Sequence, residues 1–561
     1  MMETIKSDAQ MSGMKPRSAV RSLSVLAVLR CAWPSLLLAT SCLLPFLSKP
    51  FRIDDSHFLM MAGQIVRHPM HPMDFTVCWN TVENCTKAYA LTPGNALMGY
   101  ALLPTVLMGG HEWMAHLTQL LFVWVAALAM VSFVLRLGWS TLHATAAALL
   151  LVAIPPFLPM ACTAMPDVLA AALAIVAMER LATWKAEQRW GQAVAAAIAL
   201  GLAGFSRSHL VLLLPLGAFF LLDGLDGRKV LDQIRRKWWL WTPVIAGFGV
   251  LAAAILTVRE HNLAIDPPSA SLIRSHVRDN FCAYLLYFSF PLPLGVCWLA
   301  NRVKARRFRM ISVVAALGIV YWLLPWKISF ALLRLRPSHL EFLFAVLGLG
   351  VLADLLFEAL KKLDHTGLVL MLWILIPLPI IYYSHLPMKY LLPCVPAVIL
   401  LCFRLLDGVS EGFSRAAIVV LIIAGCGYSL LIEHADAEFA QFGRDALHDL
   451  ITPHVAAGER VWYPGQYWSF WYAPLDGAEL IEPTGPQPKR GDLLVVDVYG
   501  QGDISALKNY PRRTLVETVA HKYRFGRTMG AGIGLYSNGS GYWLWGFGES
   551  DKDRFELWKI D

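Results

Sequence analysis

Long apolar runs separated by short polar loops fill the chain from about residue 23 to residue 432. The apolar runs lie at 23–47, 113–135, 140–158, 161–179, 191–205, 208–222, 239–258, 281–299, 310–326, 339–358, 367–384, 388–404 and 414–432. A helix needs roughly 20 apolar residues to cross a bilayer, and most of the runs approach that length. The pattern therefore predicts a polytopic α-helical membrane protein with about 13 transmembrane helices.

Two apolar segments differ from an ordinary membrane crossing. The segment 94–109, GNALMGYALLPTVLMG, is short and rich in Gly and Pro, so we expect it to skim the membrane rather than cross it. The first apolar run, 23–47, is too long for the core of a signal peptide and lacks a clean cleavage site. We therefore expect it to be retained as the first helix.

The pattern changes at about residue 433. From there, β-type runs such as RGDLLVVDVYG and TLVETVAHKYRFG alternate with Gly, Pro and Asp turns, while RDALHDLITPHV has helical spacing. The sequence thus predicts three parts: a disordered tail at 1–22, a transmembrane domain at 23–432 that includes a large loop at 48–112, and a soluble α/β domain at 433–561.

Composition supports a membrane protein and excludes a nucleic-acid partner. The chain is 57% hydrophobic and 16% charged, with a mean hydropathy of +0.52, whereas a soluble domain is about 25% charged. The formal charge of +8 is spread over short loops between apolar runs, so it forms no basic patch for nucleic acid. The expected partner is the lipid bilayer of the inner (plasma) membrane.

The basic loops predict the orientation of the chain. Lys6, Lys15, Arg17 and Arg21 place the N-terminus in the cytoplasm, because cytoplasmic loops are enriched in Lys and Arg. Counting crossings from there makes the later basic loops cytoplasmic, among them DGRKVLDQIRRK and NRVKARRFR. If 94–109 also crossed, all of these loops would face outward. The loop at 48–112 and the C-terminal domain are therefore expected on the external side.

With this orientation, several ionisable residues gather at the external ends of the helices. They are Asp54, Asp55, His57, Asp167, Arg207, His209, Arg274, His276, Arg278, Lys327, Arg334, Arg336, His339 and Lys389. External Arg and Lys run against the usual bias and commonly pair with an anion. The alternative is that each basic side chain merely reaches the lipid headgroups. Because acids lie at the same depth, we favour a site.

The acidic pair in RIDDSHFLMMAGQIVRHP opens the external loop. Apolar residues follow it at helical spacing, so Asp54 and Asp55 fit the start of a surface helix, where carboxylates cap free N–H groups. Capping alone is one interpretation of this pair. Asp167, which follows Pro166, has the same alternative at the start of its own helix. The histidines at 57, 209 and 276 fit interfacial hydrogen bonding, and Tyr390 fits an interfacial aromatic belt.

Cysteines and short motifs add little chemistry. Most of the ten cysteines lie in apolar runs, but Cys78 and Cys85 share one polar loop. In an external loop these two are expected either to form a disulfide or to remain free thiols. The sequence has no P-loop, no dinucleotide fingerprint and no zinc-type Cys/His spacing. It therefore indicates no cofactor and no ATP-driven reaction. A divalent metal between the acids stays an open alternative for which the chain has no supporting ligand spacing.

Five stretches of the chain resemble the GT-C glycosyltransferases, in particular the bacterial protein O-mannosyltransferase and lipid A aminoarabinose transferase families. They are RIDDSHFLMMAGQIVRHP, GNALMGYALLP, TAMPDVLAAALAIVAMER, GLAGFSRSHLVLLLPLGAFFLL and MKYLLPCVPAVILL, in the order expected of those families. The resemblance implies that the chain takes a sugar from a polyprenyl-phosphate donor on the external face. It also implies transfer to an acceptor hydroxyl, or to a lipid or polymer acceptor, with inversion of the anomeric centre.

The resemblance also implies roles for particular residues. Sugar transfer to a hydroxyl needs a base for the acceptor proton and cations for the departing phosphate. The base is expected to be Asp54, with Asp55 and Asp167 orienting the acceptor or tuning the pair. The expected phosphate-binding residues are Arg207, Lys389, Arg334 and Arg336. The expected substrate contacts are His57, His209 and Tyr390.

The chain departs from those families at two positions, and rival functions remain. The families often have Asp-Glu where this chain has Asp54 and Asp55, and many have Lys where this chain has Arg207, which changes the geometry of a phosphate contact. The rivals are a transporter or flippase of polyprenyl-linked or anionic substrates and a non-catalytic envelope assembly protein. A transporter is expected to carry charged groups near mid-span, whereas here they cluster at one face. The sequence leaves the sugar and the acceptor open.

Overall fold

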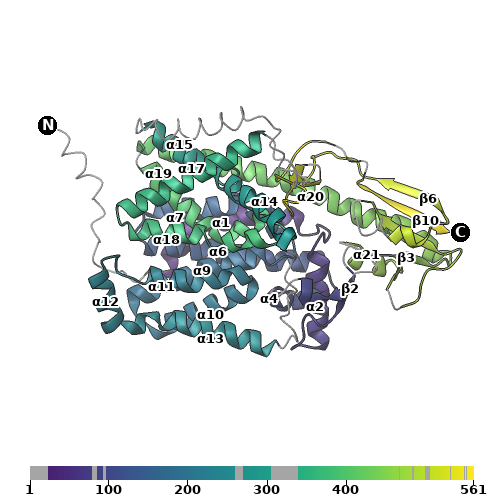
Figure 1. The fold of residues 1–561 in the computed structure, drawn as a ribbon, viewed down its shortest axis with the longest axis horizontal. Helices are drawn as coiled ribbons and strands as arrows, with labels where there is room; N and C mark the ends of the chain where they lie inside the picture. Colours follow the sequence, from purple (N-terminus) through teal and green to yellow (C-terminus); the bar gives the residue numbers. More distant parts are fainter. Residues whose placement is uncertain are drawn as a thin grey trace.

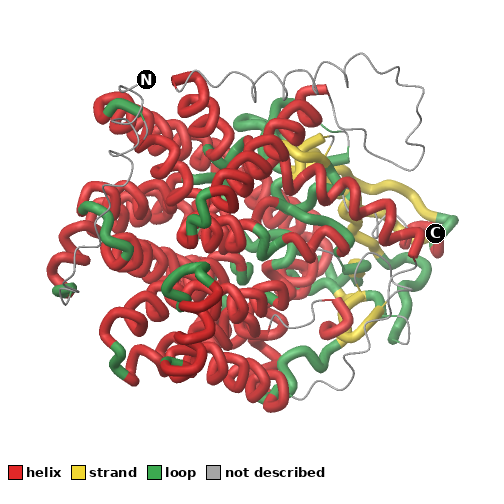
Figure 2. The backbone as a smooth tube through the Cα atoms, turned by 60° about the vertical axis from the view of Figure 1, so that its left-hand side comes forward, coloured by secondary structure: helices red, strands yellow, loops and turns green. Residues whose placement is uncertain are grey.

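The computed structural model describes residues 23–78, 85–91, 96–258, 270–304, 339–407, 409–465, 468–482, 485–498, 506–530, 532–548, 550 and 552–561. The chain is mostly helical, and its strands gather at one side (Figure 2). The predicted tail at 1–22, the predicted helix at 310–326 and the predicted phosphate ligands Arg334 and Arg336 lie outside the described residues.

The first half of the chain is helical apart from one short hairpin. Its elements are α1 (Val25–Leu43), η1 (Leu44–Phe46), α2 (Asp55–Arg67), β1 (Thr76–Cys78), β2 (Cys85–Lys87), α3 (Ala88–Leu91), α4 (Ala96–Ala101), α5 (Leu103–Leu107), α6 (Glu112–Arg136), α7 (Thr141–Ala153), α8 (Phe157–Ala161), α9 (Asp167–Glu187), α10 (Trp190–Ser206), η2 (Ser208–Leu212), α11 (Leu213–Phe220), α12 (Gly227–Arg236), η3 (Trp238–Trp241) and α13 (Thr242–Thr257).

The second half continues with helices and ends in strands. Its helices are α14 (Ala270–Ser289), α15 (Leu294–Lys304), α17 (His339–Lys361), α18 (His365–Ile374), η4 (Leu378–Tyr382), η5 (Met388–Cys394), α19 (Val395–Asp407), α20 (Glu411–Ala456), α21 (Ser469–Leu475) and η6 (Leu507–Asn509). Its strands are β3 (Val461–Tyr463), β4 (Glu479–Leu480), β5 (Leu493–Asp497), β6 (Arg513–Ala520), β7 (Met529–Gly530), β8 (Gly532–Gly534), β9 (Gly541–Trp543) and β10 (Arg554–Ile560).

Within the described residues, seven helical segments are long and apolar enough to cross a membrane, or eight if one bent pair counts as a single span. The bent pair, His276–Ser289 and Leu294–Lys304, replaces the straight helix predicted at 281–299 and turns by 57°. Three further apolar helices, Thr141–Ala153, Trp190–Ser206 and Ser208–Phe220, are shorter than a crossing requires. The structure therefore confirms a mostly helical protein with membrane-type helices but does not confirm about 13 crossings.

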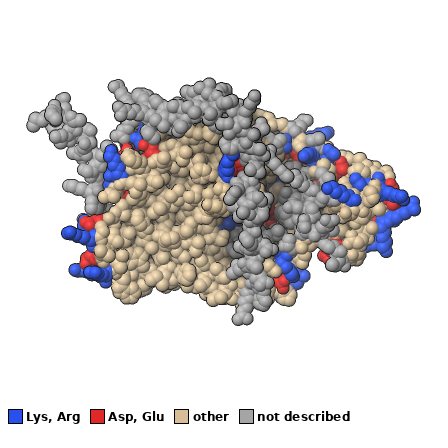
Figure 3. Space-filling view, viewed as in Figure 1, with Lys and Arg blue, Asp and Glu red and all other residues tan. Residues whose placement is uncertain are grey.

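On the face that Figure 3 shows, the charged side chains of the described residues lie mainly toward the two ends, with a broad uncharged face between them. Helix α13 exposes large apolar side chains, among them Ile245, Phe248 and Leu256. The helical rows of Figure 1 lie along that face, with α12 at one end and strands β6 and β10 at the other. An apolar belt between two charged rims is the surface that a bilayer requires. Several membrane-type helices and this belt indicate an integral membrane protein.

The C-terminal strands form the sheets that their sequence pattern predicts. One five-stranded sheet has the order β4-β3-β5-β10-β6, with β10 antiparallel to both of its neighbours and β3 parallel to both of its own. A second sheet has the order β7-β8-β9. The predicted helix RDALHDLITPHV forms part of α20, which runs for 46 residues from the apolar part into the strand-rich part (Figure 1). The predicted division at residue 433 falls inside this helix and stays a prediction.

A hairpin in the loop at 48–112 contains both Cys78 and Cys85. Strands β1 and β2 pair antiparallel, and their register sets residue 78 opposite residue 85. Cys85 is disulfide-bonded, while the eight cysteines at 31, 42, 162, 282, 297, 394, 402 and 426 are free. These observations favour the disulfide over two free thiols.

Candidate active site

Asp54 directly precedes α2, in the position from which a carboxylate usually caps a helix. Among the described residues, however, its side chain caps no N–H group of α2. The Asp54 Oδ2 atom lies instead 3.2 Å from the Nζ atom of Lys389 on η5. The Asp54 side chain is 36% exposed and that of Lys389 only 2%. Asp54 thus presents an accessible carboxylate whose partner is a buried cation.

Asp55 has a different environment from its neighbour. It is buried, and its two carboxylate oxygens accept hydrogen bonds from the backbone N–H groups of Arg52, at 2.9 Å, and Ala164, at 2.7 Å. Burial raises the pKa of Asp55 to about 7, although both N–H groups and Lys49 oppose the rise. Both carboxylate oxygens of Asp55 thus accept hydrogen bonds. Through these two bonds Asp55 joins the start of α2 to the loop between α8 and α9.

The backbone before Asp54 is held in an unusual conformation. Ile53 has a φ of +52°, which a β-branched residue rarely adopts. Such a residue costs on the order of 1–3 kcal/mol and persists only where its surroundings fix the chain. Here the Asp55 N–H group donates to the Arg52 carbonyl at 3.0 Å and closes the turn around Ile53. The direction of the Asp54 side chain is therefore set by a tightly held loop.

Asp167 and Arg207 form a second ion pair. Helix α9 begins with Asp167 directly after Pro166, and Arg207 is the first residue after α10. Because α9 begins and α10 ends at the same end of this helix pair, the two side chains meet, with Arg207 Nη2 2.6 Å from Asp167 Oδ1. Among the described residues, Arg207 Nε and Asp167 Oδ2 have no hydrogen-bond partner. Arg207 therefore keeps an N–H donor beyond its bond to Asp167.

Tyr390 connects the two ion pairs. The Arg207 guanidinium carbon lies 4.7 Å from the centre of the Tyr390 ring, and Lys389 Nζ lies 5.7 Å from the same centre. The Lys389 Nζ atom also lies 3.3 Å from the Met165 sulfur, two residues before Asp167. Two cations, an accessible carboxylate and a paired carboxylate thus meet around one aromatic ring.

Electrostatics separate the roles that these groups can fill. Burial raises the pKa of Asp54, but Lys389, with smaller contributions from His385 and His57, opposes this effect, and the pKa lies below its ordinary value. Burial lowers the pKa of both His57 and His385 to about 4, so both imidazoles are neutral near pH 7. The positive charge at this site therefore comes from Lys389 and Arg207.

The structure brings together Asp54, Asp55, Asp167, Arg207, Lys389 and Tyr390 from the residues singled out in the sequence. His209 lies further out, with ring centres 6.5 Å from Tyr390. The His57 ring packs against Phe58 and Phe75. His385, which sequence reasoning did not single out, stacks on Tyr390 with ring centres 6.0 Å apart. Its only signal is its place in HLPMKY, four residues before Lys389.

No protein-family model and no curated protein sequence matches this chain. Among solved structures it is similar to the Archaeoglobus fulgidus oligosaccharyltransferase tethered to an acceptor peptide with the NVT sequon, at 14% identity over 86% of this chain and 72% of that chain, with a TM-score of 0.46. It is also similar to ArnT from Cupriavidus metallidurans bound to undecaprenyl phosphate, at 14% identity over 89% of this chain and 97% of that chain, with a TM-score of 0.41. Likenesses at this level assign neither a family nor an activity to the chain.

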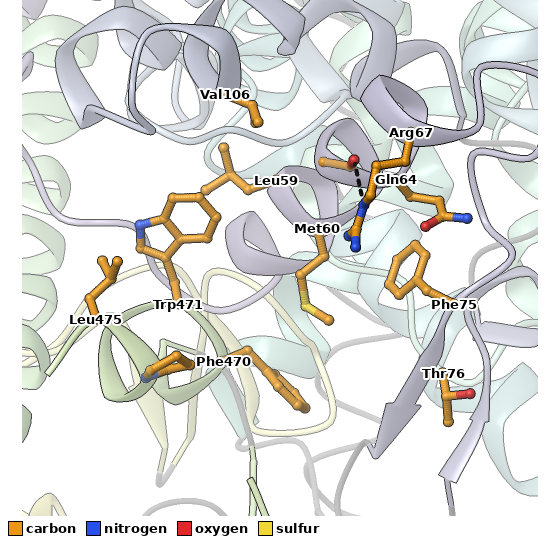
Figure 4. A pocket seen from close by; sticks show the side chains of 12 residues that line it. Leu59, Met60, Gln64, Arg67, Phe75, Thr76, Val106, Phe470, Trp471 and Leu475 are labelled. Atoms are coloured by element: carbon orange, nitrogen blue, oxygen red, sulfur yellow. Dashed lines mark hydrogen bonds between the residues drawn. The ribbon is translucent and has the colours of Figure 1, made fainter. Parts of the chain in front are cut away.

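A cavity of about 360 Å³ lies beside α2 (Figure 4). Its wall consists of one face of α2, the β1 region and α21 of the C-terminal part, and it is mostly apolar, with Leu59, Phe75 and Trp471 among its lining residues. The exposed Arg67 side chain stands at the polar part of the wall. Phe75 also contacts His57, three residues after Asp54, so the cavity adjoins the acidic end of α2.

No group of three or more His, Cys, Asp or Glu side chains within the described ranges could hold a metal ion. Asp54, Asp55 and Asp167 each have protein partners, which are Lys389, two backbone N–H groups and Arg207, respectively. The carboxylates can accept a proton, and the paired cations can bind an anion.

Proposed function

We propose that the chain is a GT-C-type membrane glycosyltransferase that transfers a sugar from a polyprenyl-phosphate donor to an acceptor hydroxyl. The observation that carries this proposal is the contact between Asp54 and Lys389. A partly exposed carboxylate there lies beside two cations, at the end of the helical part next to the C-terminal strands. Sugar transfer from a phosphate needs this combination of a proton acceptor and an anion-binding group.

The reaction would be a single displacement. The acceptor oxygen forms a bond to the anomeric carbon while the bond from that carbon to the phosphate oxygen breaks, with its electron pair passing to the phosphate. The acceptor proton passes to the Asp54 carboxylate. Lys389 and Arg207 stabilise the negative charge that grows on the departing phosphate. Attack opposite to the leaving group inverts the anomeric centre.

Donor binding would also activate the base. In the present structure Lys389 pairs with Asp54 and keeps the pKa of that carboxyl low, which makes Asp54 a weak proton acceptor. A donor phosphate that takes Lys389 as its partner removes this stabilisation, while the desolvation that raises the pKa persists. Asp54 then becomes more basic only when the donor is in place, which limits unproductive reactions of the empty site.

The other two acids would position groups rather than react. Asp55 is committed to two backbone N–H groups and fixes the start of α2. Asp167 is 2% exposed and holds Arg207 at 2.6 Å, so it sets the direction of the guanidinium. A bidentate guanidinium suits a phosphate, and its unpaired Nε–H is available for one.

The site's surroundings fit a lipid-linked donor. Asp54 directly precedes α2, which lies between the helical rows and the C-terminal strands in Figure 1, so a polyprenyl tail would stay in the bilayer while the sugar reaches Asp54. From the charge pattern of the loops, we assign this end to the external side of the membrane. The acceptor (a protein, lipid or glycan) is not specified by these residues.

Mass spectrometry of envelope glycolipids and glycoproteins tests this function. Cells with the gene are compared with cells that lack it and with cells that carry Asp54→Asn. We expect one hexose- or pentose-sized addition to be present only with the native chain, and polyprenyl-phosphate sugar to accumulate in the other two. Identical glycans in all three strains would reject the function, whereas a lipid-linked sugar confined to the cytoplasmic leaflet would indicate a flippase.

A further inference from the structure

Residues 528–530 and 532–538, around β7 and β8, bring the C-terminal part of the chain to both loops of the candidate site. We propose that this segment is a positioning element of the site, in which Thr528 and Tyr536 hold the loop of Asp54 and Asn538 holds the loop of Lys389. This inference rests on the proposed function and assigns the C-terminal part a role in it.

Asp436 is a buried carboxylate on α20 that binds residues from both parts of the chain. It accepts hydrogen bonds from Lys49 Nζ at 2.7 Å, from the Tyr536 hydroxyl at 2.6 Å and from Thr528 Oγ1 at 2.9 Å, and it also pairs with the Arg52 guanidinium. The side chains of Lys49, Arg52 and Asp436 are at most 1% exposed. Residues of the C-terminal part thus complete a buried ion network that contains Arg52.

This network extends to the acidic pair. Arg52 Nη1 donates to Thr528 Oγ1 at 3.0 Å, while the Arg52 backbone N–H donates to Asp55 Oδ2 at 2.9 Å. A further hydrogen bond holds Phe51, the residue before Arg52, since the Phe51 N–H group donates to the Tyr472 hydroxyl of α21 at 2.8 Å. The side chain and backbone of Arg52 are thereby fixed two residues before Asp54.

Ion pairing explains why the network tolerates burial. The Asp436 carboxylate pairs with both Lys49 and Arg52, and Lys49 Nζ also lies 3.0 Å from Glu433 Oε1. Buried ion pairs of this kind add little net stability but are strongly disrupted when one member is removed. Burial raises the pKa of Tyr536 well above its ordinary value, so its hydroxyl stays protonated and donates to Asp436.

The loop before Lys389 is bound by Asn538. Asn538 Oδ1 accepts a hydrogen bond from the Leu386 N–H group at 2.7 Å, and Asn538 Nδ2 donates to Asn280 Oδ1 at 2.9 Å. Asn280 in turn donates to the Tyr383 carbonyl at 2.7 Å. The Tyr536 ring lies 5.5 Å from Lys389 Nζ. Tyr536 thus contacts the network behind Asp54, and Asn538, two positions later, contacts the loop before Lys389.

Hydrogen exchange and kinetics on the full chain in detergent or nanodiscs test the proposal. In Thr528→Val/Tyr536→Phe, we expect the amides of residues 51–57 to exchange about tenfold faster, because two hydrogen bonds to the Arg52–Asp436 network are lost. In Asn538→Leu, the same is expected for residues 383–389. The matched control is Thr514→Val/Tyr510→Phe, which removes the hydrogen bonds of Thr514 to Asp561 Oδ2 at 2.8 Å and of Tyr510 to Gln487 Oε1 at 3.4 Å, and we expect no change in either loop.

The kinetic readout separates positioning from general stability. Both test variants are expected to lower kcat for sugar transfer about tenfold and to change the donor KM less than about twofold, because Arg207 and Lys389 remain while their spacing from Asp54 loosens. Unchanged exchange in both loops would overturn the proposal whatever the transfer rate. Faster exchange with unchanged kcat would also overturn it. If the native chain transfers no sugar, the proposed function fails, and loop exchange alone still decides whether the contact holds the loops.

Discussion

Replacing Asp54 with Asn is expected to lower the rate of sugar transfer by about 10²–10⁴-fold, the contribution typical of a positioned general base. The amide cannot take the acceptor proton at neutral pH. It does keep an oxygen for Lys389 Nζ, which lies 3.2 Å from the native carboxylate, so the variant should insert and fold. The measurement is single-turnover transfer from a polyprenyl-phosphate sugar at saturating donor, with thermal unfolding as the check on folding.

The matched control for this substitution is Asp74→Asn. Asp74 also lies in the loop at 48–112, has an exposed side chain and pairs with a lysine, since its Oδ1 atom is 2.8 Å from Lys87 Nζ. We expect Asp74→Asn to leave transfer within about twofold of the native rate, because exposed ion pairs contribute little. Full transfer activity in Asp54→Asn would remove Asp54 from the mechanism.

Replacing Lys389 with Met is expected to cost about 10²–10³-fold in kcat, comparable to the loss of one charge-stabilising donor. It should also move the acid limb of the kcat/KM profile to higher pH. Burial raises the pKa of Asp54 and Lys389 opposes this effect, so removal of the lysine leaves burial in control and raises the pKa. A base must be deprotonated to act, so the residual activity should fall off at a higher pH than in the native chain.

Other charged or titratable groups near Asp54 are not expected to mask this shift. His57 and His385 have pKa values of about 4 because of burial, and Arg207 remains positive throughout. Burial raises the pKa of Asp55 to about 7, but its opposing contacts are Lys49 and two backbone N–H groups rather than Lys389, so its titration should be common to the native chain and the variant. Lys87→Met, which breaks the exposed pair with Asp74, is the control and should leave the profile unchanged. An acid limb that stays in place, or moves to lower pH, in Lys389→Met would show that Lys389 does not set the basicity of the catalytic carboxylate.

The sequence predicted the membrane-type helices and the C-terminal strands because both leave a local signal. Apolar length marks helices such as Glu112–Arg136, and alternating β-type runs mark strands such as β5 and β6. It did not predict how far each helix runs, because apolar composition does not reveal where a helix stops. Helix α7 ends after 13 residues, and the run at 281–299 is broken by a sharp bend.

The sequence also singled out most residues of the candidate site, because external charges next to apolar runs are unusual. It could not assign their different environments. Asp54 and Asp55 are neighbours, yet Asp54 is partly exposed beside Lys389, whereas Asp55 is buried and accepts hydrogen bonds from two backbone N–H groups. That difference depends on Ala164 and Lys389, which lie more than 100 residues away along the chain.

The network around Asp436 left no sequence signal at all. Lys49 and Asp436 are 387 residues apart, and Tyr536 follows Asp436 by a further 100. Neither spacing belongs to a local motif, so only the folded chain brings them together. The same holds for Asn538 and Leu386, which are 152 residues apart.

A structure of the full chain with a bound polyprenyl phosphate would test the central claim most directly. The account predicts that the phosphate lies within hydrogen-bond distance of Lys389 Nζ and Arg207 Nε, that Lys389 has left Asp54, and that the Asp54 carboxylate faces the side of the phosphate where a sugar would be attached. A phosphate bound away from both cations, with Lys389 still paired to Asp54, would contradict it.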